Sequence, residues 1–190
     1  MNIILASKSP RRQELLHRIG IEDYTVLVPE VEESYPAGLS PEETVKYISR
    51  KKALAAKDLA APGDLIIAAD TMVFLGNERL GKPKDEADAL RMLTSLQGQK
   101  HTVCTGVTVL RGDRVLTEAE ATDVYFRSAT AEELCRYIRG GEPMDKAGAY
   151  GVQGKGSLLV RRIEGDYYNV MGLPLVRLSA MLQHFGITLL

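Results

Sequence analysis

One carboxylate, Asp70, follows an uninterrupted run of apolar or small residues, Leu65–Ala69. A run of this kind, without a helical period, predicts a strand that is buried on both faces of a sheet. Asp70 then stands where the strand is expected to end, and ligand-binding residues of open α/β sheets gather outside the carboxyl ends of the strands. The position therefore predicts a functional carboxylate. The alternative is an aspartate that caps a helix or forms a turn.

A cluster of hydroxyl and guanidinium groups follows the first apolar run of the chain. Ser9 suits the N-cap position of a helix, and Pro10 suits its first helical position. Arg11 and Arg12 then fall in the first turn, where the positive end of the helix dipole disfavours them unless an anion is bound. Together with the Ser7 hydroxyl and the exposed N–H groups, they predict a phosphate site. A solvated basic turn is the alternative.

Two glycine patterns are similar to nucleotide-binding loops but differ from them in decisive positions. Gly76–Lys82 matches most of a Walker A loop, yet Pro83 offers neither a hydroxyl for magnesium nor an N–H for phosphate. Proline also disfavours helical dihedrals at Lys82, so this lysine can reach a phosphate only as a point charge from a loop. The glycines of 148–156 precede a strand rather than a helix, which excludes the dinucleotide fingerprint. Within them, Gln153 offers an amide donor and acceptor suited to a base edge.

The composition narrows the class of protein. With 190 residues and a net charge of −1, we expect one domain, residues 1–190, and no electrostatic attraction to nucleic acid or to an anionic membrane. No apolar run is long enough to cross a bilayer, and Met1–Ala6 is too short for a signal peptide. Cys104 and Cys135 have no neighbour at metal spacing, so we expect reduced thiols and a cytoplasmic location.

Strands and helices are predicted along the whole chain. Capping boxes at Ser40 and Thr130 mark two helix starts, the first of a helix that runs to about Ala61. Lys51 and Lys52 lie in the middle of that helix, where most lysines are solvated. The other expected strands are 2–6, 24–28, 100–110, 114–126 and 158–163, with two short ones around a turn at 76–78, and the other expected helices are 10–19, 85–96 and 174–185.

Five ordered motifs resemble the Maf family of nucleoside triphosphate pyrophosphatases over nearly the whole chain. They are Leu5–Arg12, Ala69–Thr71, Gly81–Pro83, Asp145–Gly154 and Gly165–Asn169. The resemblance implies a mixed α/β fold, a twisted sheet with flanking helices, in two lobes around a central cleft, related to the inosine-triphosphate pyrophosphatases. It also implies a divalent metal and release of pyrophosphate from a nucleoside triphosphate substrate. Met72 and Met171 stand where the family usually has β-branched residues.

The resemblance also implies roles for single residues. Asp70 matches the proton acceptor of the family. Arg11, Thr71 and Gln153 carry the residue types of the subgroup that acts on dTTP and UTP. Glu33, Lys52 and Lys82 match charged residues that line the family's cleft.

The expected mechanism follows from the charge of a triphosphate. Arg11, Arg12, Lys52 and Lys82 would neutralise it, together with Mg²⁺ or Mn²⁺ at Glu33 and Asp70. Ser7 and Ser9 are expected to contact the substrate, and Asp70 to take the proton of the attacking water. A regulator linked to cell division, which binds nucleotide without hydrolysing it, remains the alternative. The sequence is compatible with a homodimer.

Overall fold

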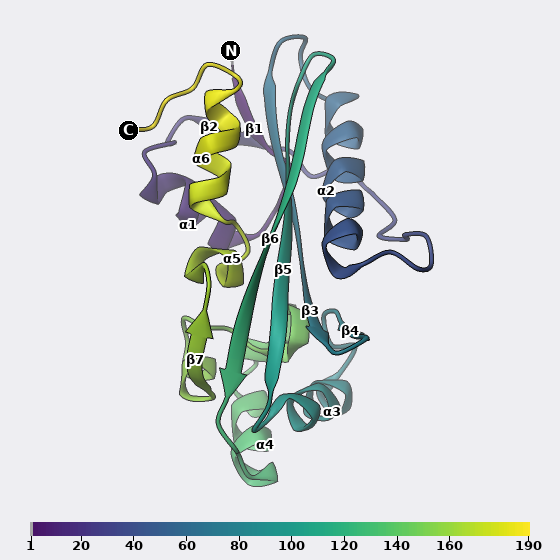
Figure 1. The fold of residues 1–190 in the computed structure, drawn as a ribbon, viewed down its shortest axis with the longest axis vertical. Helices are drawn as coiled ribbons and strands as arrows, with labels where there is room; N and C mark the ends of the chain where they lie inside the picture. The colour runs from purple at the N-terminus through teal and green to yellow at the C-terminus, as the bar shows by residue number, and fades with distance from the viewer. Residues whose placement is uncertain (1) are drawn as a thin grey trace. The chain divides into compact units, whose positions relative to one another are not determined.

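The computed structural model describes residues 2–190, which form a mixed α/β fold around one seven-stranded sheet (Figure 1). The strand order is β2-β1-β3-β5-β6-β7, with β4 paired to β3. The chain divides into two compact units. The first unit holds the chain up to Asp70, Thr105–Glu120 and Gly172–Leu190; the second holds Thr71–Cys104 and Ala121–Met171. The strands are β1 (Ile3–Leu5), β2 (Tyr24–Val26), β3 (Leu65–Leu75), β4 (Glu78–Leu80), β5 (Lys100–Arg111), β6 (Arg114–Phe126) and β7 (Val160–Glu164).

The helices begin at the predicted signals. Ser40 and Thr130 each form the predicted capping box, and Asp85 caps the helix after it. The first unit contains α1 (Pro10–Arg18), α2 (Pro41–Lys57) and α6 (Leu175–Gln183). The second unit contains α3 (Glu86–Leu96), α4 (Ala131–Arg139), α5 (Tyr167–Met171) and the 3₁₀ helices η1 (Glu142–Asp145), η2 (Ala147–Ala149) and η3 (Lys155–Leu158). The four short helices α5 and η1 to η3 were not predicted, and α2 ends earlier than expected.

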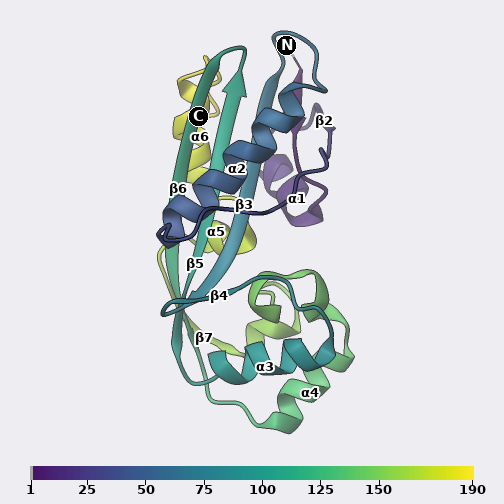
Figure 2. The same cartoon turned by 90° about the vertical axis from the view of Figure 1, so that its right-hand side faces the viewer.

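In the first unit, α2 covers one face of the sheet, and α1 and α6 cover the other (Figures 1 and 2). Strands β2 and β3 pair with β1 in parallel. Side chains of β3 alternate between the two faces, so Ile66 and Ala68 pack toward α2 in one cluster with Ala53 and Ala56. Asp70 is the next residue of this alternation, and it is therefore directed to the α2 side.

Strand β3 corrects one prediction. It does not end at Asp70 but runs for 11 residues in all, from Leu65 to Leu75. The chain stays extended because its second half pairs antiparallel with β4, Val73 opposite Leu80. What ends near Asp70 is the parallel neighbour, since β1 stops at Leu5 opposite Ile67. Asp70 thus lies inside one strand and just beyond the end of another.

The second unit is anchored by the motif Gly165–Asn169. Asn169 is fully buried and donates from Nδ2 to the carbonyl of Val103 (3.0 Å) and to Thr122 Oγ1 (2.9 Å). The Thr122 hydroxyl also accepts from the Asp166 N–H and donates to the Asp166 carbonyl. Asn169, the last residue of this motif, therefore links α5 to strands β5 and β6.

A ring cluster packs elsewhere in the second unit. His101 lies edge-on to Phe126 and Tyr150, and its Nε2 is 2.7 Å from the Tyr150 hydroxyl. Burial lowers the pKa of His101 to about 4. The imidazole is therefore neutral at pH 7. His101 serves as a packing residue, in agreement with the lack of a catalytic motif around it in the sequence.

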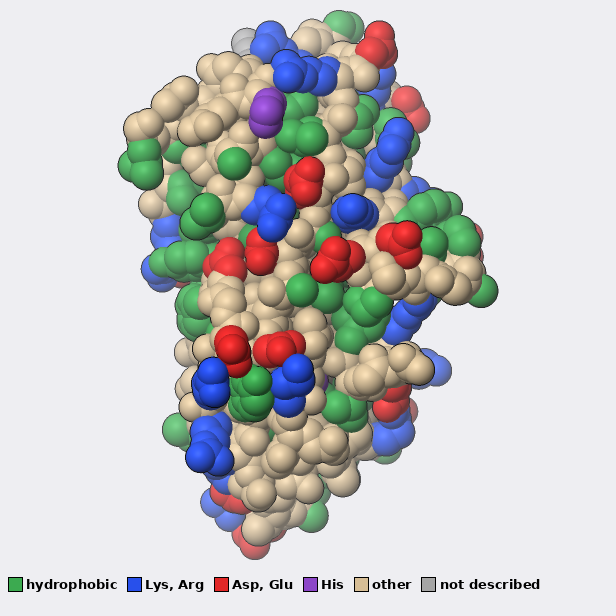
Figure 3. Space-filling model, in the orientation of Figure 1, with side chains coloured by type: hydrophobic (Ala, Val, Ile, Leu, Met, Phe, Trp, Pro, Cys, Tyr) green, Lys and Arg blue, Asp and Glu red, His purple; other side chains and the backbone are tan. Residues whose placement is uncertain are grey.

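Charges of both signs are distributed over the surface. On the face drawn in Figure 3, Lys and Arg side chains are interspersed with Asp and Glu, as expected when 24 basic residues balance 25 acidic ones. Within residues 2–190, no helix is both long and apolar enough to cross a membrane.

Candidate active site

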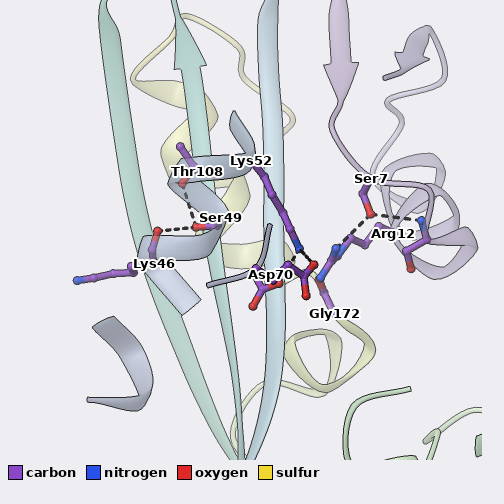
Figure 4. Close-up of polar contacts among 10 residues, drawn as sticks. Ser7, Arg12, Lys46, Ser49, Lys52, Asp70, Thr108 and Gly172 are labelled. Carbon is purple, nitrogen blue, oxygen red and sulfur yellow. Dashed lines mark hydrogen bonds and ion pairs between the residues drawn. The ribbon is translucent and has the colours of Figure 1, made fainter. Parts of the chain in front are cut away.

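The carboxylate of Asp70 forms the centre of a charged cluster in the first unit (Figure 4). Lys52 reaches from α2 to β3, and its Nζ lies 2.7 Å from Asp70 Oδ1 and 2.6 Å from Glu33 Oε1. The Asp70 side chain is 8% exposed and the Lys52 side chain 17%, whereas that of Glu33 is 58% exposed. One ammonium therefore compensates a buried carboxylate and an exposed one.

The second oxygen of Asp70 is the unusual atom of this cluster. Oδ2 is buried and has no hydrogen-bond partner among the described residues. A buried carboxylate oxygen without a partner is costly, and its lone pairs are suited to accept a proton, a water or a cation. Asp70 thus offers a free acceptor beside a fixed positive charge.

The donor set also fits a hard divalent cation. Asp70 and Glu33 share one lysine and can supply two carboxylate oxygens. Among residues 2–190, no group of three or more His, Cys, Asp and Glu side chains is arranged to hold a metal. Such a partial set suits Mg²⁺ or Mn²⁺, which keep several ligand positions for water and for substrate phosphate.

The acidic loop is held in place by two neighbouring lysines of α2. Lys51 donates from Nζ to the carbonyl of Glu32 (2.7 Å) and to the Ser34 hydroxyl (3.3 Å), and Lys52 binds Glu33. The sequence pattern identified Lys52 by resemblance but gave no role to Lys51. Because α2 fixes the loop on both sides of Glu33, this carboxylate has a defined position in spite of its exposure.

Arg12 is built into the start of α1. Its Nε donates to the carbonyl of Gly172 (2.8 Å) and its Nη1 to the Ser7 hydroxyl (3.1 Å). Burial lowers the pKa of Arg12, and the nearby charge of Asp70 opposes this effect. A guanidinium carries five N–H donors in one planar group, so Arg12 can anchor the backbone and also face an anion. Arg12 therefore joins two segments and still presents positive charge.

The two serines of this turn differ in function. Ser9 occupies the predicted N-cap position of α1, but its side chain makes no capping bond. The Ser7 hydroxyl, which is buried, accepts instead from the Ser9 N–H (3.3 Å) and from Arg12. Arg11 lies half-buried in the first turn of the helix. The structure thus brings Ser7 and Arg12 into direct contact, and the phosphate contacts of Ser9 and Arg11 stay predictions.

The contact with Gly172 gives a testable effect on stability. Arg12→Lys keeps the charge but removes the planar fork, so the bond to the Gly172 carbonyl is lost, at a cost of about 1–2 kcal/mol in the free energy of unfolding. Thermal denaturation should show a lower Tm. Arg18→Lys is the control in the same helix, because Arg18 forms an exposed ion pair with Glu14 (2.8 Å) and its replacement should leave Tm nearly unchanged. Equal Tm values for both variants would contradict an anchoring role for Arg12.

The remaining predicted residues belong to the second unit. Thr71 is half-buried directly after Asp70. Lys82 is exposed in a loop, and α3 begins only at Glu86, so the exclusion of a P-loop is confirmed. The carbonyl of Gly81 accepts from the Gly148 N–H (3.0 Å), which ties this loop to the glycine-rich segment. Gln153 is exposed within that segment.

Comparison with known proteins agrees with these features. Residues 2–185 match the family described as Maf-like protein. A dTTP/UTP pyrophosphatase of Symbiobacterium thermophilum is 49% identical over 97% of this chain and 94% of that protein. A dTTP/UTP pyrophosphatase of Dictyoglomus turgidum is 50% identical over 99% and 98% of the two chains.

The fold is similar to that of a solved structure. The structure of the Staphylococcus aureus Ham1 protein aligns with a TM-score of 0.55 and 16% identity over 97% of this chain and 100% of that chain. At this identity the likeness concerns the fold alone, and it agrees with the predicted mixed α/β class. With the family match across residues 2–185, the chain belongs to the Maf family.

Proposed function

We propose that this chain hydrolyses dTTP and UTP to the nucleoside monophosphate and pyrophosphate. The observation that carries the proposal is the buried, unpartnered Oδ2 of Asp70 beside the Lys52 ammonium. The names of the relatives that are about half identical over nearly the full length support the choice of substrates.

In the proposed reaction, Asp70 acts as the general base. Its Oδ2 accepts a proton from a water molecule whose oxygen attacks the α-phosphorus. The bond from the α-phosphorus to the bridging oxygen breaks, and pyrophosphate leaves with that oxygen. Lys52 holds Asp70 through the other oxygen, Oδ1, at 2.7 Å, so the carboxylate keeps its orientation.

The positive side chains would neutralise the triphosphate. Arg12 is oriented by the Gly172 carbonyl and Ser7, which reduces the conformational entropy lost when it binds an anion. Arg11, Lys52 and Lys82 are the further proposed phosphate ligands, with the hydroxyls of Ser7 and Ser9. Asp70 and Glu33 would hold Mg²⁺ or Mn²⁺. The ion, when bound, would lower the pKa of a coordinated water and neutralise phosphate charge.

The base would be recognised by Thr71 and Gln153, with Arg11 as the third residue of the dTTP/UTP type. The Gln153 amide has both a donor and an acceptor, which match the N–H and carbonyl of a uracil or thymine edge. Guanine presents a different pattern, so the polar groups of the protein would be left unpaired against it.

A panel of nucleotides tests the proposal. We expect kcat/KM for UTP and dTTP to exceed that for GTP and 7-methyl-GTP by about ten- to a hundredfold for each hydrogen bond lost. Gln153→Glu replaces the amide donor by a charged acceptor and should lower the pyrimidine values more than the purine ones. The measurement is pyrophosphate release with magnesium or manganese, and with a chelator as the control.

The same assay decides between the enzyme and a regulator that only binds nucleotide. A regulator would bind UTP without releasing pyrophosphate under any of these conditions. Equal kcat/KM values across the panel would contradict the base specificity instead. The cytoplasmic location, the single domain 1–190 and the homodimer stay predictions.

A further inference from the structure

The glycine-rich loop Gly151–Gly156, which carries Gln153, is bound to one carboxylate. Glu142, the first residue of η1, accepts at Oε2 from the Lys155 N–H (2.8 Å) and at Oε1 from the Gly156 N–H (3.1 Å). Both donors follow Gln153 in the chain, so both oxygens of Glu142 hold the C-terminal side of the loop.

A tyrosine holds the other side of the same loop. The hydroxyl of Tyr137, on α4, accepts from the Gly151 N–H (3.2 Å) and donates to Glu142 Oε1 (2.9 Å). Tyr137 is 7% exposed, whereas Gln153 is exposed to solvent. The backbone on both sides of Gln153 is therefore tied to one Tyr–Glu pair, and Gln153 itself is exposed between these two anchor points.

The glycines are explained by the closeness of this pair. A Cβ atom at Gly154 would overlap the carboxylate of Glu142, and one at Gly156 would overlap the Gly151 carbonyl and the Tyr137 hydroxyl. Only glycine allows the backbone to come this near. The pattern that is similar to a nucleotide-binding fingerprint thus serves contacts within the protein at these two positions.

The protonation states of Glu142 and Tyr137 match the hydrogen bonds that they form. Burial raises the pKa of Glu142, but the hydrogen bonds from Gly156, Lys155 and Tyr137 outweigh it and bring the pKa below its ordinary value. Burial raises the pKa of Tyr137, which keeps its hydroxyl protonated as a donor. At neutral pH the loop is therefore held by charge-assisted hydrogen bonds, which are stronger than neutral ones.

We propose that Glu142 and Tyr137 are positioning residues that hold the Gln153 loop in the conformation that selects a pyrimidine base. The inference rests on the proposed function, because Gln153 is the residue that would read the base. Neither residue needs to touch the substrate; together they act through the three loop N–H groups that they fix, two held by Glu142 and one by Tyr137. Fixing the loop before binding reduces the ordering cost for the correct base.

Tyr137→Phe tests this role with the loss of a single oxygen. The Gly151 N–H loses its acceptor and Glu142 loses a donor, so the loop opens more often. Amide exchange at residues 151, 155 and 156 should accelerate about tenfold, while kcat/KM for UTP falls about tenfold, mainly through KM, and that for GTP falls less. Glu142→Gln should have a larger effect, because its NH₂ group faces an N–H donor.

Tyr125→Phe is the matched control. Tyr125 lies in the same unit and donates a hydrogen bond to an exposed glutamate of β7, Glu164 (3.1 Å), which is outside the loop. It should retain the exchange rates of the loop amides and the ratio of kcat/KM values for UTP and GTP.

The outcomes separate the two proposals. If the loop amides of Tyr137→Phe exchange at the parent rate, Tyr137 does not hold the loop. This conclusion is independent of which substrate the parent prefers. Faster exchange with an unchanged ratio for UTP and GTP would overturn the role in base selection. A parent without preference for UTP and dTTP would contradict the proposed function itself.

Discussion

Asp70→Asn should lower kcat for pyrophosphate release from UTP by about 10²–10⁴-fold, the usual contribution of a general base. Asparagine has nearly the same shape, and its oxygen can still accept the hydrogen bond from Lys52 that Asp70 accepts at 2.7 Å. What it lacks is the carboxylate oxygen that can take a proton. Nucleotide binding, measured by titration, should change far less than kcat.

Asp113→Asn is the control for this exchange of a carboxylate for an amide. Asp113 also accepts from a lysine of α2, Lys57 (3.1 Å), but it lies fully exposed in the β5–β6 turn. Its replacement should leave kcat unchanged. Near-parent turnover in Asp70→Asn would remove Asp70 from the role of the base, and the unpartnered Oδ2 would then need another explanation.

Local signals in the sequence were sufficient to predict most of the helices and strands. The capping boxes at Ser40 and Thr130 need only residues three positions apart, and both form in the structure. The buried run before Asp70 likewise predicts a strand correctly. The end of that strand could not be predicted, because it depends on β4, which pairs with the second half of β3 after a turn.

The contacts that complete the candidate site are distant in sequence. Arg12 binds the carbonyl of Gly172, 160 residues away, and a backbone carbonyl leaves no signal in the residue type. Glu142 lies 13 and 14 residues before the N–H groups that it holds. The glycines of the loop were visible in the sequence, but only the fold shows that their neighbour is a carboxylate of the protein.

Lys52→Met should be the most destabilising of the proposed changes. It removes the partner of Asp70, whose side chain is 8% exposed, and leaves a buried charge without its ion pair. Removing one member of a buried pair costs about 3–5 kcal/mol, and we expect about 3, because the charge of Arg12 also acts on Asp70. Chemical denaturation in the presence of a chelator measures this loss without compensation by a cation.

The double variant Lys52→Met, Asp70→Asn separates the stability of the pair from its chemistry. With the buried charge gone, the free energy of unfolding should recover most of the loss, whereas kcat should stay as low as in Asp70→Asn. Lys57→Met, on the same helix, removes an exposed pair and should leave stability nearly unchanged. If the double variant were no more stable than Lys52→Met, the lysine would stabilise the protein by packing its methylene chain rather than by compensating Asp70. Recovery of stability without turnover would mean that Lys52 serves the fold by compensating the charge of Asp70, and that the carboxylate itself is needed for catalysis.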